Sequence, residues 1–293
     1  MIQSAAVKCC RPNPPCKHFC RLDGHLIAGQ GVIRNPDNGW GYEVIKVLAV
    51  GGMGTTYLVY SHHHQKLAVL KEINNELAHK PKVREMFQRE ARILSSLRHS
   101  GVPQYYDFFA TEDRYSLIME LIHGQNFAEV ESDDPIEIIN WFLDLARILE
   151  YLQQCDPPVI HRDIKPSNII LRRNPREIVL IDFGAVKEVT APPGTCIATP
   201  GYGAPEQSVG KACFQSDFYA LGTTAIAFFS RLFPSNFYDG VQQKFIGLDL
   251  FNVHPIMIEV IDRLTGYNPE DRPKDAKEVI DLLETAKVGM GQK

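Results

Sequence analysis

Two short polar segments at a fixed spacing constrain this 293-residue chain more than any other feature. Residues 161–168 read His-Arg-Asp-Ile-Lys-Pro-Ser-Asn, and residues 182–184 read Asp-Phe-Gly. Apolar runs between the two segments predict two short strands that pair as a hairpin, with its turn near residues 174–175. Such a hairpin returns Asp182 to the side of Asn168, so the spacing predicts one site built from both segments.

The side chains of these segments are those that phosphoryl transfer requires. This chemistry depends on positioning and charge neutralisation more than on covalent catalysis. Asp163 is the candidate base for a hydroxyl group, and Lys165, on the same side of an extended loop, could hold the γ-phosphate. Asn168 and Asp182 offer the hard oxygen ligands that Mg²⁺ prefers. Either segment alone could be a salt-bridged loop of an unrelated fold, but both in this order favour the catalytic interpretation.

A glycine-rich turn lies upstream, within residues 47–59, where two β-rich runs flank Gly51, Gly52 and Gly54. Glycine tolerates positive φ and lets backbone N–H groups approach phosphate oxygens closely. Many hairpins contain adjacent glycines, so this turn by itself is a weak indication of a phosphate site.

A further candidate is Lys71, at the end of the predicted strand 68–71. The segment 86–97 has helical spacing with its apolar residues on one face, and Glu90 borders that face. A Lys71–Glu90 ion pair would hold the lysine against the α- and β-phosphates. The alternative is that both residues are ordinary surface charges.

Together, the motifs resemble those of eukaryotic-type serine/threonine protein kinases, and most of all the bacterial, cyanobacterial-like subgroup with an N-terminal cysteine cluster. The likeness covers roughly residues 41–286 and is carried by VIHRDIKPSN (159–168), IVLIDFGAVK (178–187) and Ala-Pro-Glu (204–206). It implies an α+β, bilobal protein-kinase-like fold, with a small antiparallel β-lobe containing one helix and a larger, mainly helical lobe. The expected divisions are a cysteine-rich extension (1–40), the small lobe (41–123), the large lobe (124–286) and a tail (287–293).

By this resemblance, the chain transfers the γ-phosphate of Mg-ATP to Ser or Thr hydroxyl groups of protein substrates, with Mn²⁺ as a possible substitute for Mg²⁺. Lys165 and Thr199 match the Ser/Thr-specific pattern of the family. In such kinases the arginine at the position of Arg162 often receives an activation-loop phosphate, and Thr190 and Thr195 are the candidate autophosphorylation sites.

The resemblance also implies a nucleotide site. Backbone groups of Glu120 and Ile122 would bind adenine, and Met119 would guard a back pocket. The full set of expected contacts is Leu48, Ala49, Val50, Gly51, Gly52, Met53, Gly54, Thr56, Ala68, Lys71, Glu120, Ile122 and Ile170. Ala49 stands where the family has its first glycine, and Thr56 where it has valine. The departure at Ala49 keeps a pseudokinase or nucleotide-binding scaffold open, and a small-molecule kinase of the same fold is a further alternative.

Downstream residues match structural positions of the family. The segment 185–203 contains few apolar residues and a Pro-Pro-Gly run, so we expect a mobile loop. By the resemblance, Glu206 is expected to form an ion pair with Arg272. Asp217, near the start of an apolar helix, is expected to brace the backbone of the catalytic loop.

Four of the seven cysteines lie near the N-terminus, at Cys9, Cys10, Cys16 and Cys20. Zinc sites usually contain Cys-x2-Cys pairs, a spacing that this cluster lacks. Three interpretations stay open: a zinc or other metal site, a redox-sensing or disulfide-forming cluster, and a tail with incidental cysteines. The three histidines at 62–64 fall where a turn is expected, which favours a solvated turn over a metal site.

Composition excludes some classes of partner. The formal charge of −4 gives no electrostatic argument for nucleic acid binding. The sequence has no apolar run long enough for a transmembrane helix, and its N-terminus lacks the apolar core of a signal peptide. We therefore expect a cytoplasmic protein that neither spans a membrane nor binds nucleic acid.

Overall fold

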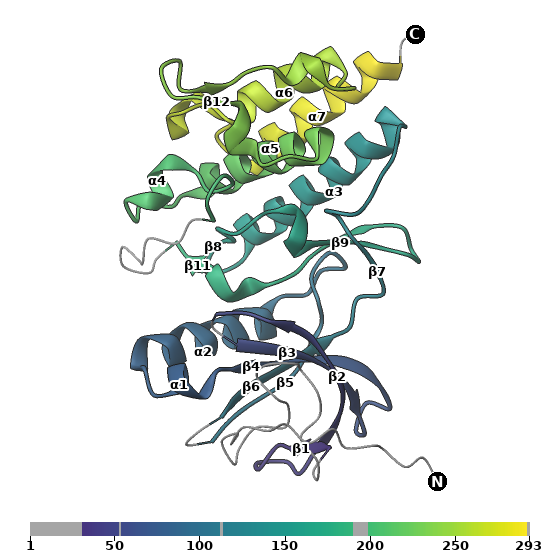
Figure 1. Cartoon of the computed structure of the whole chain (residues 1–293), viewed down its shortest axis with the longest axis vertical. Coiled ribbons are helices and arrows are strands. Elements are labelled where there is room, and N and C mark those ends of the chain that lie inside the picture. The colour runs from purple at the N-terminus through teal and green to yellow at the C-terminus, as the bar shows by residue number, and fades with distance from the viewer. Residues whose placement is uncertain (1–30, 53, 112–113, 190–198, 292–293) are drawn as a thin grey trace, which may run out of the picture. The chain divides into compact units, whose positions relative to one another are not determined.

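The computed structural model describes residues 31–52, 54–111, 114–189 and 199–291. These residues form two compact units, which Figure 1 shows in purple to blue and in teal to yellow. Unit 1 consists of the described residues up to 96 and of residues 104–121, and unit 2 of residues 97–103 and the described residues from 122 onward. Within the described ranges, no helix is both long and apolar enough to cross a membrane.

Unit 1 contains an antiparallel sheet with the strand order β1-β2-β3-β4-β6-β5. Its strands are β1 (Val32–Arg34), β2 (Gly41–Val50), β3 (Gly54–Ser61), β4 (Lys66–Ile73), β5 (Tyr105–Ala110) and β6 (Tyr115–Glu120). Burial alternates along β3, where Tyr57, Val59 and Ser61 are buried, as expected of a strand with one covered face. Tyr42 and Leu70 join Tyr57 and Val59 in the core of the unit.

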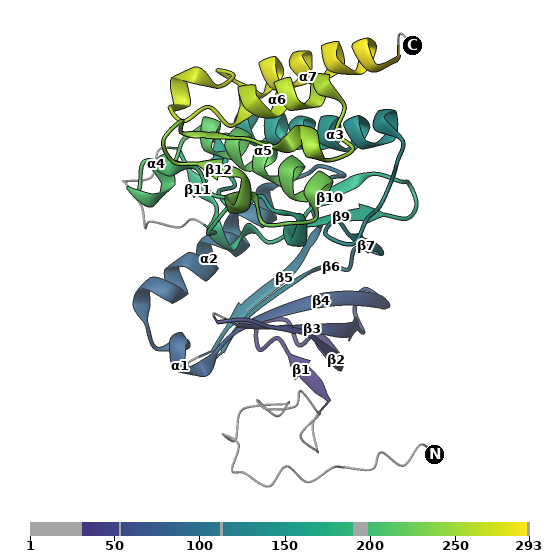
Figure 2. The same cartoon turned by 45° about the horizontal axis from the view of Figure 1, so that its top comes forward.

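Two helices follow β4: the single-turn α1 (Asn75–Ala78) and the longer α2 (Pro81–Ser96). Pro81 opens α2, at a position where a backbone N–H would have no helical partner. Phe87, Ala91 and Leu94 lie on the buried face of α2, which packs on β5 and β6 (Figure 2). The predicted antiparallel sheet with a helix packed on it is confirmed.

Residues 32–34, which lie within the predicted N-terminal extension 1–40, form the first strand of this sheet. β1 pairs with β2, and the buried Asn35 donates from Nδ2 to both carboxylate oxygens of Asp107, at 3.0 and 2.8 Å. Tyr42 donates a further hydrogen bond to the same carboxylate at 2.5 Å. These donors satisfy the buried carboxylate of Asp107, which would otherwise be destabilising. Because β1 pairs with β2, the sheet begins before residue 41.

Unit 2 is mainly helical. Its helices are α3 (Pro135–Gln154), α4 (Pro205–Ser208), α5 (Phe214–Ser230), α6 (Pro255–Leu264) and α7 (Ala276–Gly291). α5 is buried on nearly every side, as its apolar sequence requires. α3 packs on α7, and α5 packs on α6 (Figure 2). Asp134 caps α3 by accepting a hydrogen bond from the N–H of Ile136.

Short strands and 3₁₀ turns complete the described part of unit 2. They are β7 (Gly124–Asn126), β8 (Val159–Ile160), η1 (Pro166–Asn168), β9 (Ile169–Arg172), β10 (Ile178–Leu180), η2 (Phe183–Ala185), β11 (Lys187–Glu188), η3 (Pro234–Phe237), β12 (Tyr238–Asp239), β13 (Lys244–Phe245), η4 (Leu248–Leu250) and η5 (Pro269–Asp271). β9 and β10 form the predicted antiparallel hairpin, with Ile169 opposite Leu180. Next to this pair, the N–H of Ile181 donates to the backbone oxygen of Asn168 at 2.8 Å. The hairpin therefore places the two polar segments side by side.

The chain contributes to unit 2 earlier than residue 124, because the segment 97–103 packs on it. The N–H of Leu180 donates to the backbone oxygen of Gly101 at 2.9 Å, and a Cβ at position 101 would lie 2.5 Å from Cδ1 of Ile148. At the other end, α7 continues through the expected tail to Gly291, with Ala286 and Met290 buried. The domain limits themselves stay predictions.

Candidate active site

The candidate catalytic loop follows β8 and is braced by Asp217 on α5. Asp217 accepts hydrogen bonds from the backbone N–H groups of His161 at 2.7 Å and Arg162 at 2.8 Å. Arg162 has a φ of 68°, a conformation that a residue with a side chain keeps only where its surroundings hold it. Burial raises the pKa of Asp217 to about 7, although the two hydrogen bonds favour the ionised form. The predicted brace is present.

Asp163 is held by two neighbouring side chains. Lys165 places Nζ 3.0 and 2.9 Å from the two carboxylate oxygens of Asp163. Thr199 donates from Oγ1 to Oδ1 of Asp163 at 2.5 Å and accepts from Lys165 at 3.1 Å. We call these three residues the Asp163 triangle. The side chain of Asp163 remains 14% exposed, so this carboxylate is both oriented and reachable, as a general base must be.

Asn168 and Asp182 are the residues that suit a magnesium ion. Asn168 donates from Nδ2 to the backbone oxygen and to Oδ2 of Asp163, both at 2.9 Å. Asp182, in the left-handed conformation, accepts from the N–H of Gly184 at 3.3 Å. An amide oxygen and a carboxylate fit Mg²⁺, which takes few protein ligands and keeps water or phosphate oxygens as the others. Groups of three or more His, Cys, Asp or Glu side chains placed for a metal do not occur in the described part.

Two buried side chains support the loop in ways that the sequence did not predict. His161 packs edge-on against Phe183 with ring centroids 5.0 Å apart, and burial lowers the pKa of His161 to about 4, so its ring is neutral near pH 7. Gln207 donates to the backbone oxygen of Arg162 at 2.9 Å and accepts from the N–H of Ala204 at 3.0 Å. Gln207 thus joins the catalytic loop to the segment that contains Ala204. Glutamine is mostly an exposed residue, so no sequence signal identified it.

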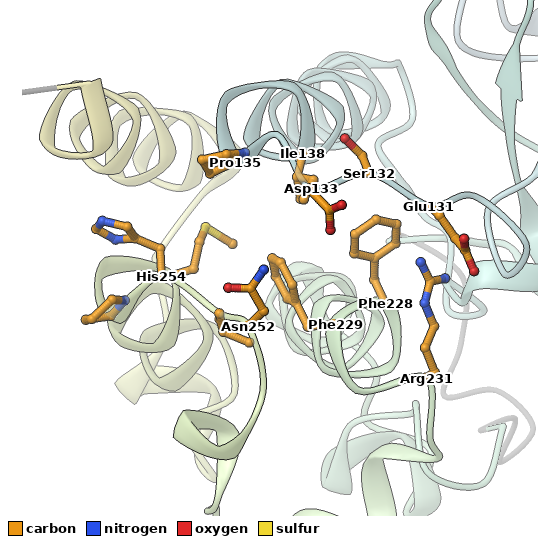
Figure 3. A pocket seen from close by; sticks show the side chains of 13 residues that line it. Glu131, Ser132, Asp133, Pro135, Ile138, Phe228, Phe229, Arg231, Asn252 and His254 are labelled. Atoms are coloured by element: carbon orange, nitrogen blue, oxygen red, sulfur yellow. The ribbon is translucent and has the colours of Figure 1, made fainter. Parts of the chain in front are cut away.

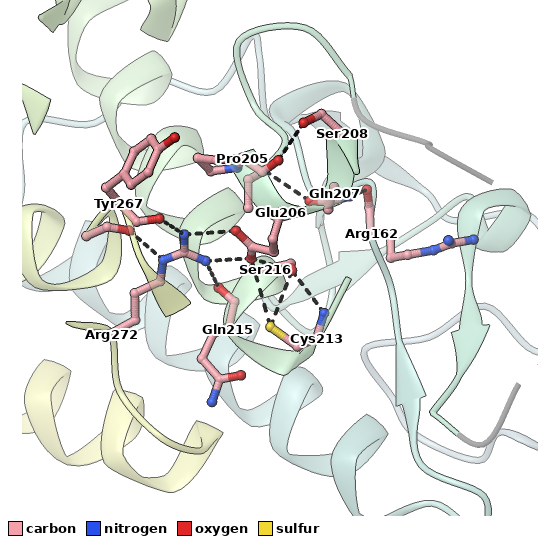
Figure 4. Close-up of polar contacts among 12 residues, drawn as sticks. Arg162, Pro205, Glu206, Gln207, Ser208, Cys213, Gln215, Ser216, Tyr267 and Arg272 are labelled. Atoms are coloured by element: carbon pink, nitrogen blue, oxygen red, sulfur yellow. Dashed lines mark hydrogen bonds and ion pairs between the residues drawn. The ribbon is translucent and has the colours of Figure 1, made fainter. Parts of the chain in front are cut away.

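The predicted ion pair between Glu206 and Arg272 is present (Figure 4). The two guanidinium Nη atoms donate to the two carboxylate oxygens at 2.7 and 3.1 Å, and Oγ of Ser216 donates to Oε1 of Glu206 at 2.6 Å. Arg272 also donates to three backbone oxygens. Burial by itself would raise the pKa of Glu206, but the hydrogen bonds from Arg272 and Ser216 outweigh it and lower this pKa.

In unit 1, Lys71 and Glu90 form the predicted ion pair. Nζ of Lys71 on β4 lies 2.7 and 3.0 Å from the two carboxylate oxygens of Glu90 on α2. Glu90 is 2% exposed, so it belongs to the buried face of α2 and not to its border. This burial excludes the alternative of two ordinary surface charges.

The glycine turn closes between β2 and β3. The N–H of Gly51 donates to the backbone oxygen of Gly54 at 2.8 Å. Asn74, which the sequence did not single out, donates from Nδ2 to the backbone oxygens of Gly51 at 3.3 Å and Gly52 at 3.2 Å. A Cβ on Gly54 would lie 2.3 Å from the backbone oxygen of Glu72, so only glycine fits at this position.

The remaining expected nucleotide contacts divide between the units. Unit 1 holds Leu48, Ala49, Val50, Thr56, Ala68 and Glu120, and unit 2 holds Ile122 and Ile170. Ala49 lies opposite Thr56 in the β2–β3 pair, where a strand tolerates a side chain, so the missing first glycine leaves the pairing intact. The N–H of Glu120 donates to the backbone oxygen of Gln104 at 2.8 Å. The roles of these residues in nucleotide binding stay predictions.

Several predicted residues lie outside the described part of the chain: Cys9, Cys10, Cys16, Cys20, Met53, Thr190, Thr195 and the rest of residues 190–198 within the segment 185–203. The predicted turn at residues 62–64 is present between β3 and β4. In this turn His63 stacks on Trp40 with ring centroids 3.7 Å apart, and His62 lies 3.5 Å from Glu43.

The elements of the two units define a protein kinase fold. A crystal structure of a doubly substituted Mycobacterium tuberculosis PknI kinase domain matches with a TM-score of 0.68 and 24% sequence identity, over 89% of this chain and 100% of that chain. The unsubstituted PknI kinase domain matches with a TM-score of 0.67 and 24% identity, over 88% of this chain and 100% of that chain. At this identity the likeness establishes the fold.

Sequence comparison identifies the family. A family model described as the protein kinase domain matches residues 42–285, so this chain belongs to the protein kinase family. It is 34% identical over 267 residues to serine/threonine-protein kinase PknA of Nostoc sp. and 31% identical over 261 residues to serine/threonine-protein kinase D of Synechocystis sp.. Each match covers 83% of this chain, but 47% of the first relative and 51% of the second. The chain thus spans about half the length of these curated relatives, and the predicted resemblance to bacterial Ser/Thr kinases is confirmed.

Proposed function

We propose that this chain acts as a serine/threonine protein kinase, which transfers the γ-phosphate of Mg-ATP to hydroxyl groups of protein substrates. The observation that carries the proposal is the Asp163 triangle, in which a reachable carboxylate, an ammonium group and a hydroxyl lie within 3.1 Å of one another. Membership of the protein kinase family and the identity with Ser/Thr kinases support it.

Asp163 supplies the base in this mechanism. A Ser or Thr hydroxyl within hydrogen-bond reach of Asp163 is oriented toward the γ-phosphorus. As its oxygen bonds to phosphorus and the bond to the ADP oxygen breaks, its proton passes to the carboxylate. Lys165 is placed to neutralise negative charge on the transferred group, and Thr199 keeps both side chains in position, so little reorganisation is needed.

Lys71 supplies a second cation, directed at the α- and β-phosphates and held by Glu90. Asn168 and Asp182 would hold Mg²⁺, which neutralises phosphate charge when it is bound. Carboxylate, carbonyl and water oxygens suit Mn²⁺ as well as Mg²⁺, so Mn²⁺ is the expected substitute.

Phosphate transfer from γ-³²P-labelled ATP, in the presence of Mg²⁺, tests the proposal on the chain itself and on a generic protein such as casein. The matched control is Asp163→Asn, which keeps the shape of the side chain and removes its basicity. Label that appears with the wild type and disappears with the variant supports the proposal. Absence of label despite ATP binding would favour the nucleotide-binding scaffold, and label only on a small-molecule hydroxyl would favour a small-molecule kinase.

Regulation by autophosphorylation is part of the same proposal. A phosphate on Thr190 or Thr195 would meet the guanidinium of Arg162, whose Nε donates to the backbone oxygen of Ala185 at 2.5 Å. Phosphorylation is then expected to raise turnover. Equal turnover of the wild type and of Thr190→Ala/Thr195→Ala would refute this role.

Two properties beyond catalysis stay predictions. A zinc ion at Cys9, Cys10, Cys16 and Cys20 is one of the open interpretations, and elemental analysis of the purified protein decides whether zinc is present. A cytoplasmic location, with protein partners and no nucleic acid, is what the sequence favours, and cell fractionation tests the location.

A further inference from the structure

Unit 2 contains a pocket formed by the ends of three helices. Its volume is about 660 Å³, and its lining comes from the start of α3 and the residues before it, the end of α5, and the start of α6 (Figure 3). These residues differ from those assigned above to phosphate transfer, so the pocket is a candidate for another interaction.

The inner wall of the pocket is apolar and aromatic. Ile138, Phe228 and Met257 are between 3 and 5% exposed, and the ring of Phe228 stacks on Phe127 with centroids 4.8 Å apart. Phe229, the next residue along α5, is half-buried, and its ring stands near the centre of the pocket (Figure 3). A wall of packed aromatic rings is rigid, and it suits an aromatic side chain of a binding partner.

The chain around the start of α3 is acidic, with carboxylates at Glu131, Asp133, Asp134 and Glu137, of which the first two line the pocket. Asp134 caps α3, and Glu137 pairs with Arg176 at 2.9 Å. Glu131 and Asp133 are exposed and line the pocket, and neither has a hydrogen bond or ion pair with another described residue. These two carboxylates are therefore available to a cationic partner.

Arg231 is a cation on the same rim, and it would repel a positively charged partner. Its guanidinium is already engaged by neighbouring groups, which weakens this repulsion. Its Nη2 donates to the backbone oxygen of Val130 at 2.6 Å, and its guanidinium lies over the ring of Phe228, 4.9 Å from the centroid. Two exposed carboxylates thus face one engaged guanidinium, and the rim favours a cation.

The chain itself contains a segment of complementary character. Residues 8–22 include four basic residues, one aromatic residue and no acidic residue, while the whole chain has a formal charge of −4. In its Lys17-His18-Phe19-Cys20-Arg21 stretch, a cation lies two residues before and two residues after the aromatic ring. In an extended chain, residues at this spacing point to the same side, so the ring can enter a pocket while both cations meet its rim.

We propose that residues 17–21 of a second copy of this chain bind in this pocket, with Phe19 against Phe228 and Phe229 and with Lys17 and Arg21 beside Glu131 and Asp133. Gly31, the first described residue, is twelve residues from Phe19 along the chain. Those residues span at most roughly 40 Å when fully extended. Binding to a second copy is not limited by this chain length, and the labelled cross-links described below distinguish it from binding within one copy.

A photoreactive residue at position 19 of the full chain tests the proposal. The Phe19→p-benzoylphenylalanine variant is prepared in ¹⁵N-labelled and in unlabelled form, and the two preparations are mixed. The mixture is irradiated in the presence of a reductant and a chelator, and the cross-linked residues are identified by mass spectrometry. The expected cross-links join a labelled copy to an unlabelled copy and end in residues 228–231 or 252–257. Cross-links that are absent, that map elsewhere, or that form within one copy would overturn the proposal.

Charge reversal supplies the second arm of the test. Glu131→Lys/Asp133→Lys is expected to lower the cross-link yield at least fivefold, and adding Lys17→Glu/Arg21→Glu is expected to restore it. Glu270→Lys/Asp281→Lys, at exposed positions that do not line the pocket, changes the net charge equally and is expected to leave the yield unchanged. The charge match would be refuted if the cross-link yield fell equally in the pocket variant and in the control variant. It would also be refuted if the Lys17→Glu/Arg21→Glu changes did not restore the yield. No phosphate transfer is measured, so the outcome is independent of the proposed kinase activity.

Discussion

At the scale of single residues, the candidate catalytic groups within each unit are charges that are paired before any substrate is present. The carboxylate of Asp163 is held by Lys165 and Thr199, and the ammonium group of Lys71 is held by Glu90. Groups positioned in this way stabilise developing charge without reorganising at the moment of reaction. Single substitutions should therefore affect turnover more than folding.

Lys71→Ala should lower kcat by roughly 10²- to 10³-fold, the usual effect of removing one preorganised donor from a reacting charge. Lys66→Ala, on the same strand but exposed, is the matched control and should stay near wild type. Steady-state phosphate transfer measures both. A Lys71→Ala kcat within threefold of wild type would remove Lys71 from the mechanism.

Thr199→Val should lower kcat by roughly 10- to 100-fold, since a hydrogen bond to a charged group contributes about 1.5–3 kcal/mol. Thr199→Ser, which keeps the hydroxyl, should recover most of the activity. Because Thr199 positions Asp163 and Lys165, the loss should appear in kcat with little change in the KM for ATP. A loss confined to that KM would contradict this role.

At the scale of elements, the start of α4 is joined to η5 and α5 by a buried network. Glu206 and Arg272 lie 66 residues apart in sequence, and Ser216 from α5 hydrogen-bonds to the same carboxylate. The family resemblance predicted the ion pair, but Ser216 and Gln207 emerged only from the packing of these elements.

Glu206→Ala should reduce the free energy of unfolding by about 3–5 kcal/mol, because it leaves the guanidinium of Arg272 buried without its counterion. The double variant Glu206→Met/Arg272→Met, which removes both charges, should reduce the free energy of unfolding considerably less. The exposed pair Arg147–Glu284, at 3.1 Å, is the control, and Glu284→Ala should change stability by about 1 kcal/mol or less. Urea unfolding compares the three variants, and equal losses from both pairs would contradict the buried-pair interpretation.

The same pair predicts a pH dependence. The pKa of Glu206 is lowered in the folded state, so below the usual glutamate pKa of about 4.3 the unfolded chain binds more protons. The stabilisation is therefore fully present above that pH and is lost as pH falls through the lower, folded-state pKa. Thermal unfolding between pH 3 and 7 should show a shallower acid decline for Glu206→Gln than for wild type, and parallel curves would refute the assignment.

At the scale of the whole molecule, the sheet of unit 1 includes residues 32–34, which lie within the predicted N-terminal extension 1–40. Asn35 donates both of its hydrogen bonds to the buried Asp107, which is 72 residues away. No periodic pattern marks residues 31–40, so local spacing predicted neither the pairing of β1 with β2 nor the contact of Asn35 with Asp107.

Deletion of residues 1–30 should leave the Tm of the chain nearly unchanged, whereas deletion of residues 1–40 should lower it clearly. The longer deletion removes β1 and leaves the carboxylate of Asp107 short of donors, a loss of about 1–3 kcal/mol or more. Asn35→Ala in the full chain should reproduce part of the loss. Scanning calorimetry of the three proteins is the measurement, and an equal Tm for both deletions would show that residues 31–40 are dispensable.

By itself, the sequence determined the chemistry of the candidate site and the class of fold. Asp163, Lys165 and Asn168 lie within six consecutive residues, so a single loop places them together, and the following hairpin returns Asp182 to them. Only the tertiary structure decided the contacts made by Gln207 and the places of residues 31–40 and 97–103. Local spacing encodes strands, helices and turns, whereas contacts between distant segments depend on how buried faces pack and on which polar groups that packing leaves in need of a partner.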